Sequence, residues 1–196
     1  MIETPEKVLA ELAAQIRVCS KCGLSQQRIQ AVPGEGNARA EIMFIGEAPG
    51  KNEDEQGRPF IGQSGKFLTS MIEEIGLRRE DVFIGNVIRC RPPENRDPLP
   101  HELTACDGWL RAQLRIIQPR VVCTLGRYAM IALIDPYMQI SKVHGTPIEK
   151  DGTLFIPLYH PAAALHQAKL RDTLIDDMRK VRAELQRRGL WQSRDK

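Results

Sequence analysis

The sequence predicts an α/β protein of three layers, with helices on both faces of a central, mainly parallel sheet of four strands. Four short apolar runs, within 41–46, 81–88, 120–125 and 154–158, alternate with helical patterns of apolar residues. Parallel strands need long crossovers, and helical crossovers cover both faces of a sheet. A length of 196 residues suits one domain. We therefore expect residues 1–196 to form a single α/β domain.

The first third of the chain is predicted to run helix, strand, loop, helix. Residues 4–17 suit a helix, because Thr4 can cap it and Pro5 fits its first turn. The strand 41–46 is followed by a loop of about twenty residues, rich in Gly, Pro and charge, with no expected element of its own. The next helix ends at Gly76 and has an apolar face of Phe67, Leu68, Met71, Ile72 and Ile75.

The rest of the chain continues this alternation. Helices are expected over 100–117, 127–134 and 168–188, with a short helical turn at 162–165. The Pro-rich loop 89–98 cannot be helical. The dipeptide Asp151-Gly152 indicates a hairpin between two short strands within 143–156.

Charge and hydropathy limit the partners and the compartment. The net charge of +3 permits a polyanionic partner without requiring one. No apolar run approaches the ~18 residues of a membrane span, and the charged first turn does not resemble a signal peptide. We therefore expect a cytoplasmic protein that contacts no membrane and keeps its cysteines reduced. We also expect it to act as a monomer.

Polar residues follow the ends of the four predicted strands. Glu47, Asn86, Gly126 and His160 should meet at one edge of the sheet, where α/β proteins bind ligands. Asn86 either caps a loop or presents its amide to the edge of a base. His160 is either structural or part of the same cleft. Phe60 stands in a charged loop, where it is either a core residue or a stacking platform.

The segment 62–66 has some features of a nucleotide-binding P-loop but lacks the required pattern. Phe60 stands where the first Gly is needed, and Lys66 is followed by Phe67 rather than Ser or Thr. We therefore reject triphosphate binding. Ser64 and Gly65 at the start of a helix can still bind a single phosphate. The basic residues Arg89, Arg91 and Arg96 are either solvated surface or phosphate contacts beside a nucleic-acid cleft.

Four of the five cysteines form two groups with the spacing of metal ligands. They are Cys19 with Cys22, and Cys90 with Cys106. Their spacing alone favours zinc, although four thiolates also bind iron–sulfur clusters and unrelated reduced thiols are the alternative. Cys123 lies inside an apolar strand, so we expect it to be a core residue.

Several motifs occur in a characteristic order along most of the chain. They are Gly46-Glu47-Ala48-Pro49-Gly50, Glu53-Asp54, Gly57-Arg58-Pro59-Phe60-Ile61-Gly62, Asn86-Val87-Ile88-Arg89-Cys90-Arg91-Pro92-Pro93, Asn95-Arg96 and His160-Pro161. Together with the cysteine grouping, they resemble the family 4 uracil-DNA glycosylases, the iron–sulfur branch of the uracil-DNA glycosylase superfamily.

The resemblance implies a cofactor that spacing alone does not select. A [4Fe–4S] cluster would be held by Cys19, Cys22, Cys90 and Cys106, in place of zinc. It would be structural, and it would tie the N-terminal helix and the Cys19/Cys22 loop to the rest of the domain.

The resemblance also implies hydrolysis of the N-glycosidic bond of deoxyuridine in single- or double-stranded DNA, after the base has flipped out of the stack. Phe60 would stack on the uracil, Asn86 would hydrogen-bond its O4 and N3–H, and His160 would bind O2. Glu47 is the candidate for activating water, and Glu53 for excluding thymine. Backbone groups near Gly46 and Ala48 would line the site. Flanking DNA contacts would come from Ser64, Gly65, Arg91 and Leu165.

Two features depart from better-known relatives. Ala48 stands where the best-known branch has Asp, so the activation of water is assigned to Glu47 by inference. His166-Gln167-Ala168 replaces the usual Arg-Asn-Pro. The alternatives are a non-catalytic metal-cluster module that binds nucleic acid, and, less well supported, a redox protein.

Overall fold

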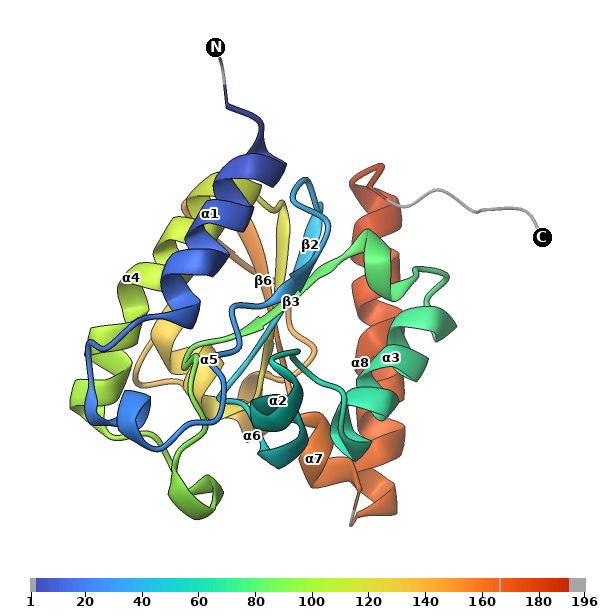
Figure 1. Ribbon diagram of the computed structural model, residues 1–196. Helices are drawn as coiled ribbons and strands as arrows, with labels where there is room; N and C mark the ends of the chain where they lie inside the picture. Colours follow the sequence, from blue (N-terminus) through green and yellow to red (C-terminus); the bar gives the residue numbers. More distant parts are fainter. Residues whose placement is uncertain (1–2, 166, 191–196) are drawn as a thin grey trace.

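A six-stranded sheet lies at the centre of the computed structural model, which describes residues 3–165 and 167–190 (Figure 1). The strands are β1 (Glu35–Gly36), β2 (Ile42–Gly46), β3 (Phe83–Asn86), β4 (Val121–Leu125), β5 (Ile148–Lys150) and β6 (Thr153–Leu158). Their order is β1-β3-β2-β4-β6-β5. The four inner strands are parallel, and the two edge strands run antiparallel to their neighbours.

The mainly parallel sheet is confirmed, but the prediction of four strands is wrong. The two further strands are the edge strands β1 and β5, of two and three residues. β1 lies in a Gly-containing segment without apolar alternation, so only its pairing with β3 defines it. β5 is the first strand of the predicted hairpin, whose turn residues Asp151 and Gly152 both have positive φ, at 50° and 78°.

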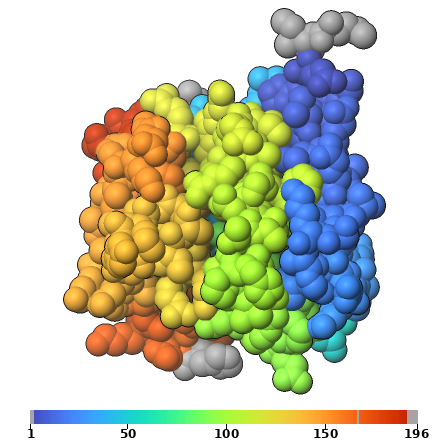
Figure 2. Space-filling model, turned by 90° about the vertical axis from the view of Figure 1, so that its left-hand side faces the viewer, coloured from blue at the N-terminus to red at the C-terminus, as the bar shows by residue number. Residues whose placement is uncertain are grey.

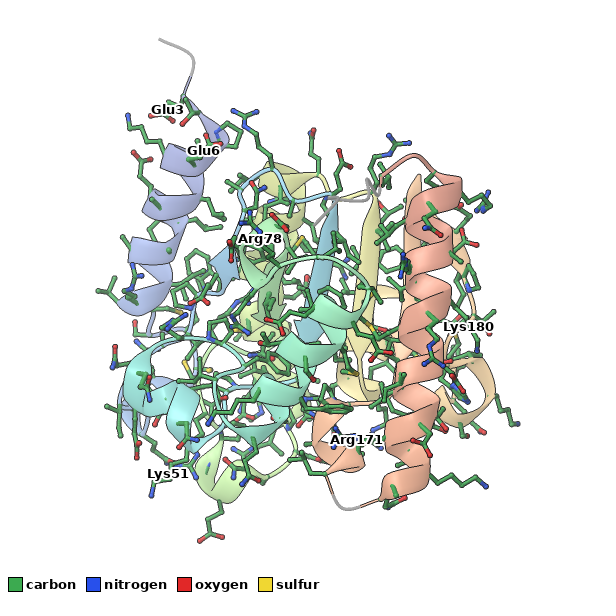
Figure 3. The ribbon with its side chains drawn as sticks, turned by 90° about the vertical axis from the view of Figure 1, so that its right-hand side faces the viewer. Glu3, Glu6, Lys51, Arg78, Arg171 and Lys180 are labelled. Atoms are coloured by element: carbon green, nitrogen blue, oxygen red, sulfur yellow. The ribbon has the colours of Figure 1, made fainter. Side chains whose placement is uncertain are left out.

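Helices cover both faces of the sheet, as predicted. The helices are α1 (Pro5–Arg17), α2 (Lys51–Gln56), α3 (Gln63–Glu74), α4 (Pro100–Ile117), α5 (Arg127–Leu133), α6 (Ile140–Val143), α7 (Pro161–Ala164) and α8 (Ala168–Arg187). One layer contains α1, α4 and α5, and Figure 2 shows α1 and α4 side by side on that face. The opposite layer contains α3, α7 and α8 (Figure 3). There Arg171 of α8 covers the ring of Phe67 in α3, with 4.8 Å between its guanidinium carbon and the ring centroid.

The central strand β2 has an uninterrupted apolar sequence because both its faces are buried. Ile42 and Phe44 belong to the core cluster under α3 and α8. Met43 and Ile45 alternate with them and belong to the cluster under α1, α4 and α5. The sheet therefore separates two apolar cores, one on each face.

The loop after β2 contains a helix that the sequence analysis did not predict. Lys51–Gln56 forms α2, which ends at Gly57 with φ +69°. It is short and polar and lacks the apolar periodicity that identifies a helix. Its two buried residues are acids, Glu53 and Asp54. Asp54 Oδ1 accepts the backbone N–H groups of Ile29 at 3.0 Å and Gln30 at 3.3 Å. Buried carboxylates therefore hold α2 in place.

Residues 140–143 form α6, so the expected strand region beginning at 143 is wrong in its first residues. The final helix agrees with its prediction to within one residue, at 168–187. His166 and residues 191–196 lie outside the described residues.

The carboxyl ends of the inner strands meet at one edge of the sheet. Gly46 pairs with Asn86, and Leu125 pairs with Leu158. The parallel pairing continues past the β2 end, since Gly46 and Glu47 accept backbone N–H groups from Val87 and Ile88, each at 2.9 Å. In Figures 1 and 3, α2 and α7 both lie at this end of the sheet. Among the described residues, no helix is both long and apolar enough to cross a membrane.

Candidate active site

A cavity of about 470 Å³ opens at this edge of the sheet. Its lining comes from the end of β3 and from the segments that follow β2, β3 and β6, including parts of α2, α3 and α7. The lining residues are Glu47, Ala48, Pro49, Gly50, Glu53, Phe60, Ser64, Asn86, Pro92, Asn95, Arg96, His160, Ala162 and Ala163. The structure therefore brings Glu47, Asn86 and His160 together with Phe60, although these residues are far apart in the sequence.

Asn86 is the buried polar residue of this cavity. Asn86 is 1% exposed, and its Oδ1 has no hydrogen-bond partner among the described residues. A buried amide oxygen without a partner is costly, and most such atoms in proteins are paired. Because Asn86 lines the cavity, a ligand that donates an N–H there would satisfy this oxygen.

His160 presents an N–H donor rather than a charge. Its Nδ1 accepts the backbone N–H of Ala162 at 3.2 Å. Burial lowers the pKa of His160 to about 4, and the nearby Glu53 carboxylate opposes that shift. The ring is therefore neutral at pH 7, and its proton is on Nε2.

The Phe60 ring lies against Gly46 and close to His160. Its centroid is 5.7 Å from that of the His160 ring, with 32° between the planes. A Cβ at Gly46 would lie 2.4 Å from Phe60 Cζ and 2.6 Å from Asn86 Oδ1. Both distances are shorter than van der Waals contact, so only glycine at position 46 allows these two side chains to approach the end of β2 so closely.

Glu47 directly follows β2 and is half-buried. Burial, together with the nearby Asp97 carboxylate, raises its pKa to about 7, and the charge of Arg127 opposes this shift. A carboxylate in this environment can accept a proton near neutral pH. Perturbed carboxyl groups in a cleft are characteristic of acid–base sites, although structural ion pairs also perturb pKa values.

Glu53 has a structural function that the sequence did not indicate. It is 8% exposed, and its Oε1 accepts the backbone N–H groups of Ile61 and Gly62, each at 2.9 Å. Two hydrogen bonds to one carboxylate oxygen fix the loop that carries Phe60. The role of Glu53 in excluding thymine stays a prediction.

The four predicted DNA contacts have different environments. Ser64 lines the cavity, whereas Gly65 is buried beneath it, where a Cβ would lie 2.0 Å from the Phe60 carbonyl carbon. Arg91 is partly exposed and donates to Asn95 Oδ1 at 2.8 Å. Leu165 is 38% exposed at the end of α7, outside the cavity lining. DNA contacts at these residues stay predictions.

Arg89 cannot contact phosphates as part of a basic surface, since its side chain is only 1% exposed. That possibility is therefore wrong for Arg89. Pro92, Asn95 and Arg96 do line the cavity, although the sequence analysis gave Asn95 no role. Arg96 is held by two bonds to Glu102, at 2.9 and 2.6 Å. Their position in a Pro-rich loop directly after β3 was the sequence feature that could have placed these residues at the cavity.

Comparison with known proteins gives consistent matches over most of the chain. The model of the Uracil DNA glycosylase superfamily matches residues 33–186. A Type-4 uracil-DNA glycosylase of Sulfurisphaera tokodaii is 49% identical over 184 residues, which cover 89% of this chain and 83% of the relative. The chain belongs to the uracil DNA glycosylase superfamily. This membership confirms the resemblance that the sequence motifs indicated, and the three-layer fold is consistent with it.

Two further relatives are also Type-4 uracil-DNA glycosylases. The one from Archaeoglobus fulgidus is 45% identical over 181 residues, which cover 88% of this chain and 91% of the relative. The one from Thermotoga maritima is 40% identical over 190 residues, which cover 95% of this chain and 99% of the relative. The similarity therefore includes the N-terminal region as well as the sheet.

In this superfamily member, the four paired cysteines gather on the α1–α4 side of the sheet. Cys90 and Cys106 belong to one core cluster, and Cys22 packs against it. The Cys90 thiol is close enough to Cys19 and Cys22 for their charges to interact. Trp109 donates its indole N–H to Cys19 Sγ at 3.4 Å, and Arg28 Nη1 donates to Cys90 Sγ at 3.0 Å.

Within the described part of the chain, no three His, Cys, Asp or Glu side chains converge as the ligands of a single metal ion do. A four-iron cluster is larger than one ion, so its four thiolates surround it without meeting at one point. Cys123 is fully buried in β4, which confirms its prediction as a core residue.

Burial raises the pKa of the Cys90 thiol and that of the Cys106 thiol, the latter to about 11, but the neighbouring cations Arg28 and Arg89 oppose these shifts and favour anionic sulfur. Arg89 is buried beside these thiols, and its charge interacts with the thiols of Cys106 and Cys90. Its Nη2 donates to Gln113 Oε1 at 2.6 Å, but its Nε and Nη1 have no partner in the described chain. Burial lowers the pKa of Arg89 to about 10, so it remains a cation at pH 7. Metal-bound thiolates would supply the counter-charge that a buried cation requires, so these residues fit a cluster.

We predict that Glu53→Ala will destabilise the protein by about 2 kcal/mol, because two backbone N–H groups lose a charged acceptor. Chemical denaturation of both proteins measures the difference. Glu55→Ala is the matched control, since Glu55 is exposed on the same helix, and it should change stability by no more than about 0.5 kcal/mol. Equal stabilities of the two variants would show that the Glu53 bonds contribute nothing.

Proposed function

We propose that this protein hydrolyses the N-glycosidic bond of deoxyuridine in DNA, releasing uracil and leaving an abasic site. The observation that carries the proposal is the unpartnered Asn86 Oδ1, buried in a cavity that also contains a neutral His160 and the Phe60 ring. The names of the Type-4 relatives support the same activity.

Asn86 provides the specificity for uracil. Its Oδ1 would accept the N3–H of uracil, and its amide N–H would donate to O4. Cytosine presents an acceptor at N3 and a donor at C4, so it would leave the buried amide mispaired. The penalty for such a mismatch in a buried site is large, whereas the correct base satisfies an acceptor that no described residue of the chain pairs with.

His160 stabilises the leaving group. As the glycosidic bond breaks, negative charge gathers on the uracil, including its O2. Nε2–H of His160 would donate to that oxygen. A neutral donor can fill this role, because a preorganised N–H dipole stabilises the charge that develops on the oxygen. The Ala162 backbone N–H holds the other ring nitrogen as an acceptor, and this fixes the tautomer.

Glu47 orients and deprotonates the attacking water. The sugar develops oxocarbenium character as the base departs, so a water molecule on the opposite side of C1′ from the base completes the reaction. Glu47 follows directly after Gly46, against which Phe60 and Asn86 lie. Its raised pKa suits a group that takes up a proton near pH 7.

The base must leave the DNA stack to enter this cavity. The Phe60 ring would stack on the flipped uracil. Ser64 at the start of α3 and the partly exposed Arg91 would contact phosphates, and the exposed Leu165 would occupy the gap left in the stack. Single- and double-stranded DNA both satisfy these requirements.

Cys19, Cys22, Cys90 and Cys106 would hold a [4Fe–4S] cluster. When bound, the cluster supplies a structural cross-link rather than redox chemistry. Cys19 and Cys22 follow α1, whereas Cys90 follows the β3 end that carries Asn86. These residues would thereby tie the N-terminal segment to the loop beside the active site.

We predict that Asn86→Asp will lower the rate of uracil release from a uracil-containing oligonucleotide by at least about 100-fold, because the carboxylate cannot donate to O4. Any residual activity should shift toward cytosine. The control is Asn95→Asp, which alters an exposed amide of the same cavity and should retain the preference for uracil. Unchanged uracil specificity in Asn86→Asp would exclude the role of Asn86. No release by the unmodified protein would reject the whole proposal and favour a binding module.

We predict that kcat/KM for uracil release will rise with pH through about 7 and then level off, because Glu47 must be ionised to accept a proton. His160 titrates near pH 4 and adds no change above about pH 5. Glu47→Gln should remove this rise and lower the plateau by about 100-fold or more. If the rise persists in Glu47→Gln, another group is responsible for it.

We predict that the purified protein will contain iron and absorb visible light, and that Cys106→Ala will lose both and melt at a lower temperature. Cys123→Ala is the control, because Cys123 lies in β4 away from the ligand set, and it should retain its iron. Metal analysis distinguishes the alternatives. Zinc in place of iron would support the zinc site that the cysteine spacing alone favours. An unchanged melting temperature after loss of the metal would exclude a structural cluster.

A further inference from the structure

Phe60 has an unusual backbone conformation for an aromatic residue. Its φ is +49°, in the left-handed region that residues with a bulky side chain rarely occupy. Such conformations persist only where surrounding contacts enforce them, and they concentrate at functional sites. The ring of Phe60 lines the cavity. The contacts that enforce this backbone therefore determine where the ring lies.

Arg79 binds the carbonyl groups on both sides of the Phe60 α-carbon. Its Nη1 donates to the Phe60 carbonyl oxygen at 3.1 Å, and its Nη2 donates to the Pro59 carbonyl oxygen. These two carbonyls flank the φ and ψ angles of Phe60. A planar guanidinium with two parallel donors is suited to fix two successive carbonyls, because its donors have a rigid geometry.

Arg79 is itself fixed from two further sides. Its Nη1 also donates to Thr69 Oγ1 in α3, at 3.2 Å. Its Nε donates to Glu35 Oε1 in β1, at 3.1 Å. The Arg79 side chain is only 18% exposed, so this ion pair is shielded from solvent better than a surface pair. Arg58 binds the same Glu35 carboxylate at 2.6 and 2.9 Å but is 57% exposed.

The remaining neighbours of Phe60 restrain the other side of the same peptide segment. Glu53 accepts the N–H groups of Ile61 and Gly62, and the backbone of Gly65 packs against the Phe60 backbone. The Arg79 cation thus binds the carbonyl groups of Pro59 and Phe60, and the Glu53 anion binds the amide groups of the next two residues. Arg79 is the member of this set that holds Phe60 itself, and it lies outside the cavity lining.

We propose that Arg79 is a positioning residue, which keeps the Phe60 ring in place for the base by holding the Pro59 and Phe60 carbonyls. This inference rests on the proposed function, in which Phe60 stacks on the flipped uracil. Arg79 touches neither the base nor the sugar, and it acts only through Phe60. A displacement of about 1 Å at a reacting group can reduce a rate about 100-fold.

The test compares single-turnover uracil release by four proteins: the unmodified chain, Arg79→Ala, Phe60→Ala and the double variant. We expect about a 100-fold loss of rate in Arg79→Ala. The double variant should be no slower than Phe60→Ala to within about twofold, because residues that act through one contact are not additive. Losses that multiply in the double variant would overturn the proposal, as would a fully active Arg79→Ala.

Arg58→Ala is the matched control, since it removes a positive charge from the same Glu35 carboxylate and leaves the Phe60 carbonyl untouched. It should keep the single-turnover rate of the unmodified chain, because the two hydrogen bonds from Arg79 to the Pro59 and Phe60 carbonyls stay in place. Arg79→Lys covers the case in which the alanine variant fails to fold. Lys retains the charge but lacks the two parallel donors of the guanidinium, so we expect Arg79→Lys to release uracil slowly even at saturating enzyme. A rate equal to that of the unmodified chain would overturn the proposal. Inactivity of the unmodified chain would instead reject the proposed function.

Discussion

The parallel pairing of β2 with β3 is the constraint on which the rest of the site depends. It places Gly46 opposite Asn86, and it continues through the carbonyls of Gly46 and Glu47. A shift of this register by one residue would turn the Asn86 side chain to the other face of the sheet. The absence of a side chain at Gly46 then creates the space that Phe60 and Asn86 share. The site is therefore specified first by backbone hydrogen bonds and only then by side chains.

Charged side chains at this site mainly hold backbone groups. The Glu53 carboxylate binds two N–H groups after Phe60, and the Arg79 guanidinium binds two carbonyls around it. Loops have few backbone partners of their own, so buried ions replace the hydrogen bonds that a strand or helix would supply. Such an arrangement fixes the ring before substrate arrives, which lowers the entropic cost of binding.

Burial shifts the pKa values of Glu47 and His160, which both line the cavity, in opposite directions. It raises the pKa of Glu47 to about 7 and lowers that of His160 to about 4. In both cases a less polar environment disfavours the charged form. The same cause therefore yields a carboxyl group that titrates near neutral pH and an imidazole that stays an uncharged donor.

The sequence by itself determined the alternation of strands and helices, the cleft at the strand ends and the positions of Glu47, Asn86 and His160 within it. Apolar periodicity and the residues after each run are local features, so they are visible without the fold. Only the tertiary structure decided the edge strand β1, the helix α2, the burial of Arg89 and the hydrogen bonds from Arg79 to the Pro59 and Phe60 carbonyls. Arg79 and Phe60 are 19 positions apart, and Glu35 and Arg79 are 44 apart. Contacts at such separations leave no local pattern, because their energy arises only when folding brings the partners together.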